Sequence, residues 1–327
     1  MNNLRYAIPR VGAVVLCVML VAPASAPAQA PIVAASEEGV TIRPGDLITV
    51  SGRYDSLIRL RPRKKGTKYK LTKIPLGVRM KPKGVDHSAY CEKVAVANTF
   101  NVVIYDTWSH TVEVLEHDKF GLIADVQWDM ACNLIIADMG GDSVGRWPRD
   151  GNLWLYTPGG DLRRIAYRQN WVNPTFLDMD EWGTLYIVDK GAEPKMPGTN
   201  GQWHFDAIYK VGAPRYTQPQ ELYKRPGLQV TAFAVQPDGT FLVGNGDVLL
   251  LLQKTSVWPL CGGKGFRRIN GVDINSDREV FFVDGFDVFQ DTFVYRLEDD
   301  YTCSLDVLAA GKMVQGAQGL VAGLPRR

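Results

Sequence analysis

The sequence lacks the short motifs that mark the commonest classes of enzyme. It contains no Walker loop, no HExxH and no GxGxxG that opens a helix, so it has none of the local signatures of P-loop NTPases, zincins or dinucleotide-binding domains. The one GxSxG match, GDSVG at 141–145, lies in a long loop with no helical apolar pattern after it, whereas a nucleophile elbow joins a strand to a helix. Histidine is scarce, with four residues in the chain. Two of them, His110 and His117, flank one expected strand and would lie at its opposite ends. The sequence therefore names no catalytic residue and leaves open whether the protein is an enzyme.

Long apolar runs are also missing. The only one, VGAVVLCVMLVA at 11–22, has 12 residues, whereas a membrane span needs ~20. It follows Arg5 and Arg10 and precedes the small residues PASAPAQA, which is the layout of a secretory signal peptide. We expect residues 1–28 to be removed and the protein to be exported, periplasmic or extracellular, with no transmembrane span. The alternative is an uncleaved N-terminal anchor.

Cysteines are few, and none has the spacing of a metal site. After removal of the signal peptide, which carries Cys17, four remain: Cys91, Cys132, Cys261 and Cys303. There is no CxxC and no histidine beside a cysteine, which argues against zinc. In an oxidising compartment four cysteines predict two disulfides, with three alternative connectivities. Free buried thiols are the other interpretation.

The chain has no net excess of charge after signal removal. Without Arg5 and Arg10, 35 basic residues balance 35 acidic ones, so we expect no nucleic-acid partner. One segment departs from this balance, because Arg53–Lys83 holds 12 Lys or Arg and a single acid, Asp55. Such a stripe can bind an anionic surface. The plainer interpretation is a solvated basic connector over residues 61–83.

What the sequence does contain is a repeat. No stretch after the signal keeps a helical apolar period over twelve residues; short apolar runs alternate with polar turns instead, as in strands. An apolar strand, a polar turn and a second strand that ends in Asp or Asn recur at 124–138, 175–189, 232–245 and 271–284, with a weaker copy at 94–106. The closing anchors are Asp106, Asp138, Asp189, Asn245 and Asp284.

These spacings are typical of β-propeller blades, which are four-stranded sheets that stack around an axis. DLITVSGRYDSLIRL at 46–60 resembles the second and third strands of a blade, and QGLVAG at 318–323 resembles a first strand. Joined, they complete a sixth blade and remove both open sheet edges. The prediction is an all-β, six-bladed propeller over 46–327, closed by its N- and C-terminal strands and preceded by a linker at 29–45. Two β-sandwiches are the alternative.

The segment INGVDINSDREVFFVDG at 269–285 resembles blades of NHL-repeat proteins and of the regucalcin/gluconolactonase family, and VNPTFLDMDEWGTLYIVDKG at 172–191 is similar. This resemblance implies a six-bladed propeller. The regucalcin-like proteins hold one divalent metal at the central channel. By this resemblance, two of its ligands would correspond to Asn173 and Asn270 here. The Glu that those proteins place in a Glu-Gly-Pro motif is absent, since Gln318-Gly319-Leu320 stands at the equivalent position.

The blade topology indicates which residues converge. The starts of the six inner strands should ring the channel, and in our alignment these are Glu92, Asp125, Asn173, Thr231, Asn270 and Gln318. Carboxylate and amide oxygens are ligands for hard cations, so Asn173, Asn270, Asp125 and Glu92 are the candidate ligands of one divalent cation (Ca, Mg, Mn or Zn). The alternative is that they cap strands and turns.

Two long loops should lie over the same face. They carry Arg146 and Trp147 in one case, and Trp203 and His204 in the other. With Thr231 and Gln318, these side chains form a candidate ligand-binding rim, because long loops on rigid scaffolds often carry function. Simple surface decoration is the alternative interpretation.

Two functions follow from these features. The favoured one is an exported propeller that binds an unidentified small molecule or protein at the channel face, as a ligand-binding or scaffolding module. The alternative, implied by the resemblance, is a metal-dependent hydrolase of lactones or related esters. In that case the metal would polarise the carbonyl and activate water.

Overall fold

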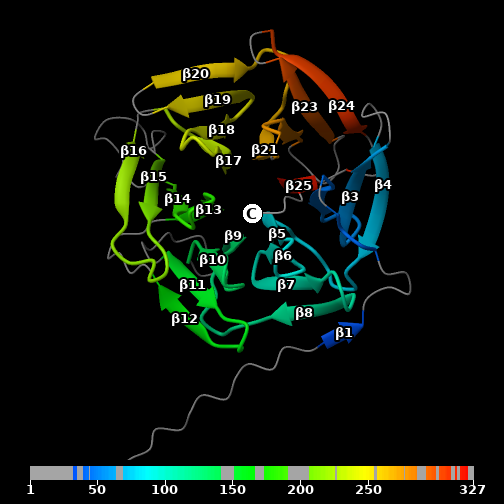
Figure 1. Cartoon of the computed structure of the whole chain (residues 1–327), viewed down its shortest axis with the longest axis vertical. Coiled ribbons are helices and arrows are strands. Elements are labelled where there is room, and N and C mark those ends of the chain that lie inside the picture. Colours follow the sequence, from blue (N-terminus) through cyan, green and yellow to red (C-terminus); the bar gives the residue numbers. More distant parts are fainter. Residues whose placement is uncertain are drawn as a thin grey trace, which may run out of the picture.

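The computed structural model is a ring of six antiparallel blades, as predicted from the repeat (Figure 1). The sheets are arranged around a central axis, and within each blade the strands follow one another from the axis to the rim. The structure describes residues 32–34, 40–43, 45–63, 69–140, 151–165, 173–190, 206–224, 227–253, 256–275, 277–285, 292–299, 302–310, 314 and 317–322. No helix long and apolar enough to cross a membrane occurs in these ranges.

The blades are labelled A to F along the chain, and each contributes four strands, from the inner to the outer one. Blade A contains β5 (Gly84–Ser88), β6 (Lys93–Asn98), β7 (Asn101–Asp106) and β8 (Thr111–Leu115). Blade B contains β9 (Ile123–Trp128), β10 (Leu134–Asp138), β11 (Asn152–Tyr156) and β12 (Leu162–Ile165). Blade C contains β13 (Pro174–Met179), β14 (Leu185–Asp189), β15 (Ala207–Val211) and β16 (Gln220–Lys224).

The remaining blades complete the ring. Blade D contains β17 (Val230–Val235), β18 (Phe241–Asn245), β19 (Val248–Gln253) and β20 (Ser256–Cys261). Blade E contains β21 (Ile269–Ile274), β22 (Val280–Asp284), β23 (Phe293–Asp299) and β24 (Ser304–Ala310). Blade F contains β25 (Ala317–Ala322), β2 (Leu47–Ser51), β3 (Ser56–Pro62) and β4 (Tyr69–Pro75).

Blade F closes the ring in the way the sequence predicts. The C-terminal strand β25 is its inner strand and pairs antiparallel with β2, so that Leu47 is opposite Ala322 and Ser51 is opposite Ala317. The basic segment is more than a connector, because its middle part forms the outer strand β4, which pairs with β3. The expected linker also contributes structure, since β1 (Ile32–Ala34) pairs with β8 at the rim of blade A.

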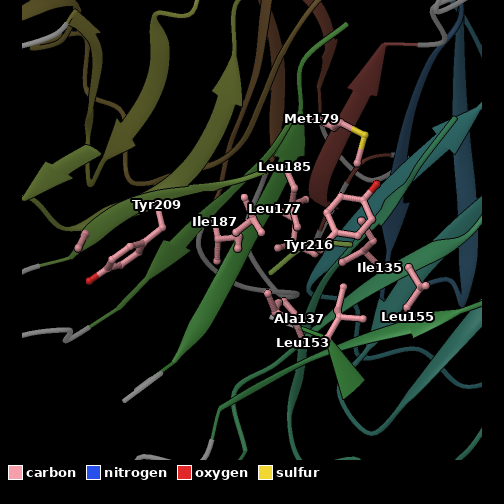
Figure 2. Packing of buried hydrophobic residues seen from close by; sticks show 13 residues of the cluster. Ile135, Ala137, Leu153, Leu155, Leu177, Met179, Leu185, Ile187, Tyr209 and Tyr216 are labelled. Atoms are coloured by element: carbon pink, nitrogen blue, oxygen red, sulfur yellow. The ribbon is translucent and has the colours of Figure 1, made fainter. Parts of the chain in front are cut away.

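The apolar core consists of six clusters, and each lies between two successive blades. Figure 2 shows the cluster between blades B and C, where Ile135 and Leu155 of one sheet pack against Leu177, Ile187 and Tyr216 of the other. A single twisted sheet cannot bury both of its faces, so each blade is stabilised by its neighbours on either side. Stacking around the whole ring therefore leaves no blade without a partner.

Two disulfides join neighbouring blades. Cys91–Cys132 links blade A to blade B, and Cys261–Cys303 links blade D to blade E. The two bridges span 41 and 42 residues, about one blade each. The prediction of two disulfides is confirmed, and of the three connectivities the structure selects the one that pairs cysteines of successive blades.

The disc has two faces, which we name by the inner strands. The inner strands begin on the start face and end on the end face, where short turns lead into the second strands. In four blades the inner strand carries a β-bulge near its start, and the bulged residues are Ala124, Thr175, Thr231 and Asn270.

The anchors that close the repeat have a defined role on the start face. Asp138, Asp189, Asn245 and Asp284 each end a second strand opposite the first residue of the inner strand of the same blade. Their side chains accept backbone N–H groups from the segment that enters this inner strand, and Asp284 Oδ1 accepts those of Arg267 and Arg268, both at 2.9 Å. The repeat was visible in the sequence because each blade needs this cap.

Our register for blade A was wrong by one strand. The segment 94–106 forms its second and third strands, and the inner strand is β5, Gly84–Ser88. The anchor of this blade is therefore Asn98, whose Oδ1 accepts the Lys81 N–H. Asp106 ends the third strand, and its carboxylate binds the N–H groups of Trp108 and Ser109 within a turn.

Candidate functional site

The channel on the axis is almost filled, and four carboxylates bridge neighbouring inner strands along it. A cavity of about 60 Å³ lies between the inner strands. Asp125, Asp178 and Asp273 each accept the N–H of the next residue with one oxygen and an N–H of the next blade's inner strand with the other. Asp86 similarly accepts the Trp128 N–H at 2.7 Å. These four carboxylates tie blade A to B, B to C, C to D and E to F.

Two of the four candidate metal ligands line this cavity. Asn270 and Asp125 do so, but both oxygens of Asp125 already accept backbone N–H groups, of Val126 and Leu177, at 2.9 Å. Burial raises the pKa of Asp125 well above its usual range, despite these two hydrogen bonds. Because both of its oxygens are already used by the protein, Asp125 is a poor ligand for a cation.

The other two candidate ligands lie apart from Asp125 and Asn270. Asn173 precedes β13, two positions before the bulge at Thr175, and its Nδ2 donates to the Lys190 carbonyl. The Asn173 Oδ1 is buried and has no partner among the described residues. Glu92 is a correction, because it lies in the turn between β5 and β6 on the end face, away from the inner-strand starts.

The candidate rim is described only in part. Thr231 occupies a bulge on the start face, and its buried Oγ1 has no hydrogen-bond partner in the described part of the chain. Gln318 lies in β25 opposite Val50. The other rim residues, Arg146, Trp147, Trp203 and His204, fall outside the described residues. Across the residues that are described, no group of three or more His, Cys, Asp or Glu side chains is placed to hold a metal ion.

Positive charge gathers at the start-face mouth of the channel. Lys190 follows β14, and its ammonium lies 5.0 Å from the centre of the Phe176 ring. The pKa of Lys190 is lowered to about 8, mainly by burial and further by the charges of Arg268 and Lys83, whereas the charge of Asp206 opposes the shift. Three cations from blades C, E and A thus act on one another here, which disfavours the approach of a divalent metal.

A larger cavity, of about 270 Å³, opens on the end face. It lies across blades A, B and C, where the inner strands β5, β9 and β13 lead into their turns. We name it the end-face cavity. Its lining comprises Asp86, His87, Ser88, Tyr90, Trp128, Asp129, Met130, Asp180 and Glu181.

The turns around the end-face cavity are held in place by hydrogen bonds and a covalent bridge. Asp129 accepts the N–H groups of Ala131 and Asn133 and the hydroxyl of Tyr216. Cys91, next to Tyr90, is bonded to Cys132, two residues after Met130. The walls are therefore fixed without a ligand, which lowers the entropic cost of binding.

Large apolar side chains are exposed around the end-face cavity. Tyr90 is 77% exposed, Met130 60% and Trp182 79%. They lie in the turns after β5, β9 and β13 respectively, so three successive blades each present one. Exposed apolar groups of this size, gathered on one face, are typical of interaction sites.

The end-face cavity was not predicted from the sequence, although the sequence carries a signal for it. The turns in question read AYCEK, DMACN and DEWGT, at 89–93, 129–133 and 180–184. Turns are normally built from small and polar residues, so a Tyr, a Met and a Trp in the corresponding turns of three repeats are unusual. The predicted site lay at the inner-strand starts, which are on the other face.

Comparison with protein-family profiles and with curated protein sequences finds no match. Solved structures do match in fold. A chain of the nidogen/laminin complex aligns with a TM-score of 0.64 and 14% identity, over 86% of this chain and 98% of that one. A streptogramin B lyase aligns with a TM-score of 0.53 and 10% identity, over 88% and 90%. A Bacteroides caccae protein of unknown function aligns with a TM-score of 0.56 and 9% identity, over 85% and 98%. At these identities the likeness extends to the fold alone.

Proposed function

We propose that the protein is an exported binding propeller that holds a protein partner on the end face of blades A to C. One observation carries the proposal: the exposed Tyr90 and Met130 line the end-face cavity, and the exposed Trp182 follows the lining residue Glu181 in the turn of the third blade. Burial of such side chains against a partner is favourable, at about 25 cal/mol per Å² of apolar surface. Aromatic side chains around a pocket are also typical hot spots of protein interfaces.

Two further features support an exported binding role. Both disulfides join neighbouring blades, which is typical of proteins that work in oxidising compartments. Among the structures of similar fold, one belongs to a nidogen/laminin complex and another is a streptogramin B lyase. The fold thus serves both binding and catalysis, so the argument for binding rests on the end face of this chain.

Site-specific photo-cross-linking in the producing cell tests the proposal. A benzophenone amino acid replaces Tyr90 or Trp182 on the end face, and in the controls it replaces Phe100 or Trp258, which are 56% and 58% exposed elsewhere. We expect a defined cross-linked protein from the two end-face positions and none from the controls. Absence of an end-face adduct, or equal adducts from all four positions, would contradict the proposal.

The alternative proposal is the metal-dependent hydrolase of lactones or related esters. It is supported by the buried Asn173 Oδ1, which lacks a donor among the described residues, and by Asn270 at the channel cavity. Millimolar calcium, magnesium, manganese or zinc should then raise the melting temperature by mass action. The rise should shrink in Asn270→Ala, and a flat response to all four ions would remove this alternative.

A further inference from the structure

The link that leads from blade F into blade A carries a row of cations on the start face. It spans residues 76–83, between the end of β4 at the rim and the first residue of β5 at the channel. Arg79, Lys81 and Lys83 are exposed, and each is separated from the next by a buried residue. This alternation is typical of an extended chain, and the proline after Lys81 restricts that residue to the same conformation. The three cations therefore project from one side of the link, about 7 Å apart.

Hydrogen bonds fix the backbone of this link. The Lys81 N–H donates to Asn98 Oδ1 at 2.5 Å, and the Lys81 carbonyl accepts the Thr99 hydroxyl at 2.8 Å. The Lys83 N–H donates to the Ala97 carbonyl at 2.9 Å. Within the described part of the chain, none of the three link cations forms an ion pair. An anionic ligand would therefore meet cations whose backbone is already ordered, which lowers the cost of binding.

A neighbouring turn adds charge at the outer end of the row. The turn 52–55 joins β2 to β3 on the start face. A Cβ on Gly52 would come within 2.8 Å of the proline of the link, so the turn and the link are in direct contact. Two cations lie near the Tyr54 ring of this turn, with the Lys73 ammonium 4.4 Å and the Arg53 guanidinium carbon 5.8 Å from its centre. The row thus extends outwards to β4.

At its inner end the row meets cations from two other blades. Lys83 lines the channel cavity, and so does Phe176, whose ring centre lies 5.0 Å from the Lys190 ammonium. The charges of Lys83 and Arg268 both act on Lys190. Lys190 is half-buried and forms no ion pair with any described residue. Like charges held close together cost free energy, and an anion at the channel mouth would offset that cost.

We call this continuous line of positive side chains the basic track. It runs from the rim to the axis and consists of Arg53, Lys73, Arg79, Lys81, Lys83 and Lys190.

The carboxylates near the basic track already accept hydrogen bonds. Asp55, in the turn 52–55, accepts the Met80 N–H at 2.6 Å. Asp206, whose charge acts on Lys190, accepts the Val230 N–H at 2.7 Å. Backbone amide donors stabilise negative charge and partly offset its field. In the described part of the start face, the surface from blade F to the channel is therefore mainly positive.

The shape of the basic track favours a chain over a single ion. Its cations follow one another from the rim to the axis, so a chain with regularly spaced anionic groups meets them in succession. Phe100, which is 56% exposed, follows Thr99 in the turn that holds the Lys81 carbonyl. The C–H face of a sugar ring packs on such a side chain. Single-stranded nucleic acids instead stack successive bases on several rings, and in the described residues one exposed ring lies beside the track.

We propose that the start face binds an acidic polysaccharide, a carboxylate-bearing sugar chain that lies along the basic track with one carboxylate at the channel mouth. The field of the track attracts such a chain, and Phe100 contacts one of its sugar rings. This site is on the face opposite the end-face cavity and does not depend on the function proposed for that cavity.

The test titrates labelled oligogalacturonates of increasing length into the purified protein at low salt and measures fluorescence anisotropy. Affinity should rise with length until the chain covers the track, and then level off. Added salt should weaken binding. The fully methyl-esterified oligomers keep the sugars and lose the charges, so we expect them not to bind. Equal binding of the esters would overturn the proposal, as would tighter binding of polyglutamate, oligothymidylate or phosphatidylglycerol vesicles.

Matched variants locate the site. Lys81→Gln combined with Lys83→Gln should weaken oligogalacturonate binding about tenfold at low salt and reduce the slope of log affinity against log salt by about 1 to 2. Arg163→Gln combined with Arg164→Gln removes an equal charge from exposed positions of β12 in blade B and should leave the affinity unchanged. Equal losses in the two pairs, or no loss in the lysine pair, would contradict the basic track.

Phe100→Ala tests the contact with a sugar ring. It should weaken oligogalacturonate binding severalfold and leave the weaker binding of polyglutamate unchanged, because polyglutamate has no sugar ring to pack on the side chain. The side chain is exposed, so the melting temperature should stay that of the wild type. Parallel losses for the two polyanions, or no loss for either, would refute the assignment to a polysaccharide.

Discussion

At the scale of single residues, the anchors on the start face show what one carboxylate contributes to a blade. Asp284 Oδ1 accepts two backbone N–H groups, and the side chain is 5% exposed. Asp284→Ala leaves both donors without this acceptor, which we expect to lower the free energy of unfolding by about 2 to 3 kcal/mol. Asp284→Asn keeps an oxygen in place and should cost about 1 kcal/mol. Urea denaturation measures both, and equal losses would contradict the role of the oxygen.

Lys190 predicts a pH dependence of stability. Its pKa is about 8 in the folded protein and 10.5 in its ordinary environment. Between these values the unfolded chain binds more protons than the folded one, so this residue makes the free energy of unfolding rise with pH from about 8 to 10. At pH 7 the buried charge destabilises the fold, and Lys190→Met should recover up to about 3 kcal/mol.

The measurement is urea denaturation of the wild type and of Lys190→Met at pH 7, 8, 9 and 10. Tyrosines and other lysines titrate in the same range, so the difference between the two proteins is the quantity of interest. It should be largest at pH 7 and shrink towards pH 10. A constant difference would show that the charge of Lys190 does not change in this window.

At the scale of elements, each disulfide fixes the contact between two blades. The loops of 41 and 42 residues predict nearly equal entropic stabilisation, about 4 kcal/mol each. Replacing Cys91 and Cys132 by Ser, or Cys261 and Cys303 by Ser, should therefore lower stability by similar amounts. Only the first pair should also weaken cross-linking from Tyr90 and Trp182, because only that bridge holds the walls of the end-face cavity. Similar weakening by both pairs would refute this link.

The strands could be predicted wherever an anchor carboxylate and an apolar second strand occur together, as at Asp189 and Asp284. The inner strand of blade A was not predicted, because its sequence, GVDHS, is short and follows KPK. Inner strands face the channel, and here Asp86 is used to bind the next blade, so no apolar run marks the strand. Asp106 imitated an anchor because turns and anchors use the same Asp–backbone hydrogen bonds.

The candidate site could be predicted less well than the strands. Residues that align in a repeat do not share a position in space when a bulge intervenes. Thr231 and Asn270 are themselves the bulged residues of their strands. Asp125 lies one residue after the bulge in its strand, and Asn173 lies two residues before the bulge in the next blade. In the structure both oxygens of Asp125 accept backbone N–H groups, one from its own blade and one from the next. This use of the carboxylate depends on tertiary packing, and no spacing in the sequence encodes it.

At the scale of the whole molecule, the closure by β25 predicts the result of a truncation. Removal of residues 315–327 deletes the inner strand of blade F, exposes the edge of β2 and takes away the Ala322 N–H that Asp273 binds. We expect this variant to unfold or aggregate. Removal of 323–327 leaves β25 intact and is the control. Circular dichroism and size-exclusion chromatography distinguish the outcomes, and a native melting curve for the longer deletion would contradict the closure.

The pairing of β25 with β2 also constrains the order in which the molecule can fold. The Thr49 hydroxyl donates to the Gly319 carbonyl at 2.7 Å, across 270 residues of chain. Contacts of such long sequence separation form slowly, because the chain between them must be ordered first. Strands β2, β3 and β4 are synthesised before blades A to E, but β2 has no inner-strand partner until β25 has been made. The step that completes the ring is therefore the least local event in folding, and a chaperone that shields β2 would protect the chain during this interval.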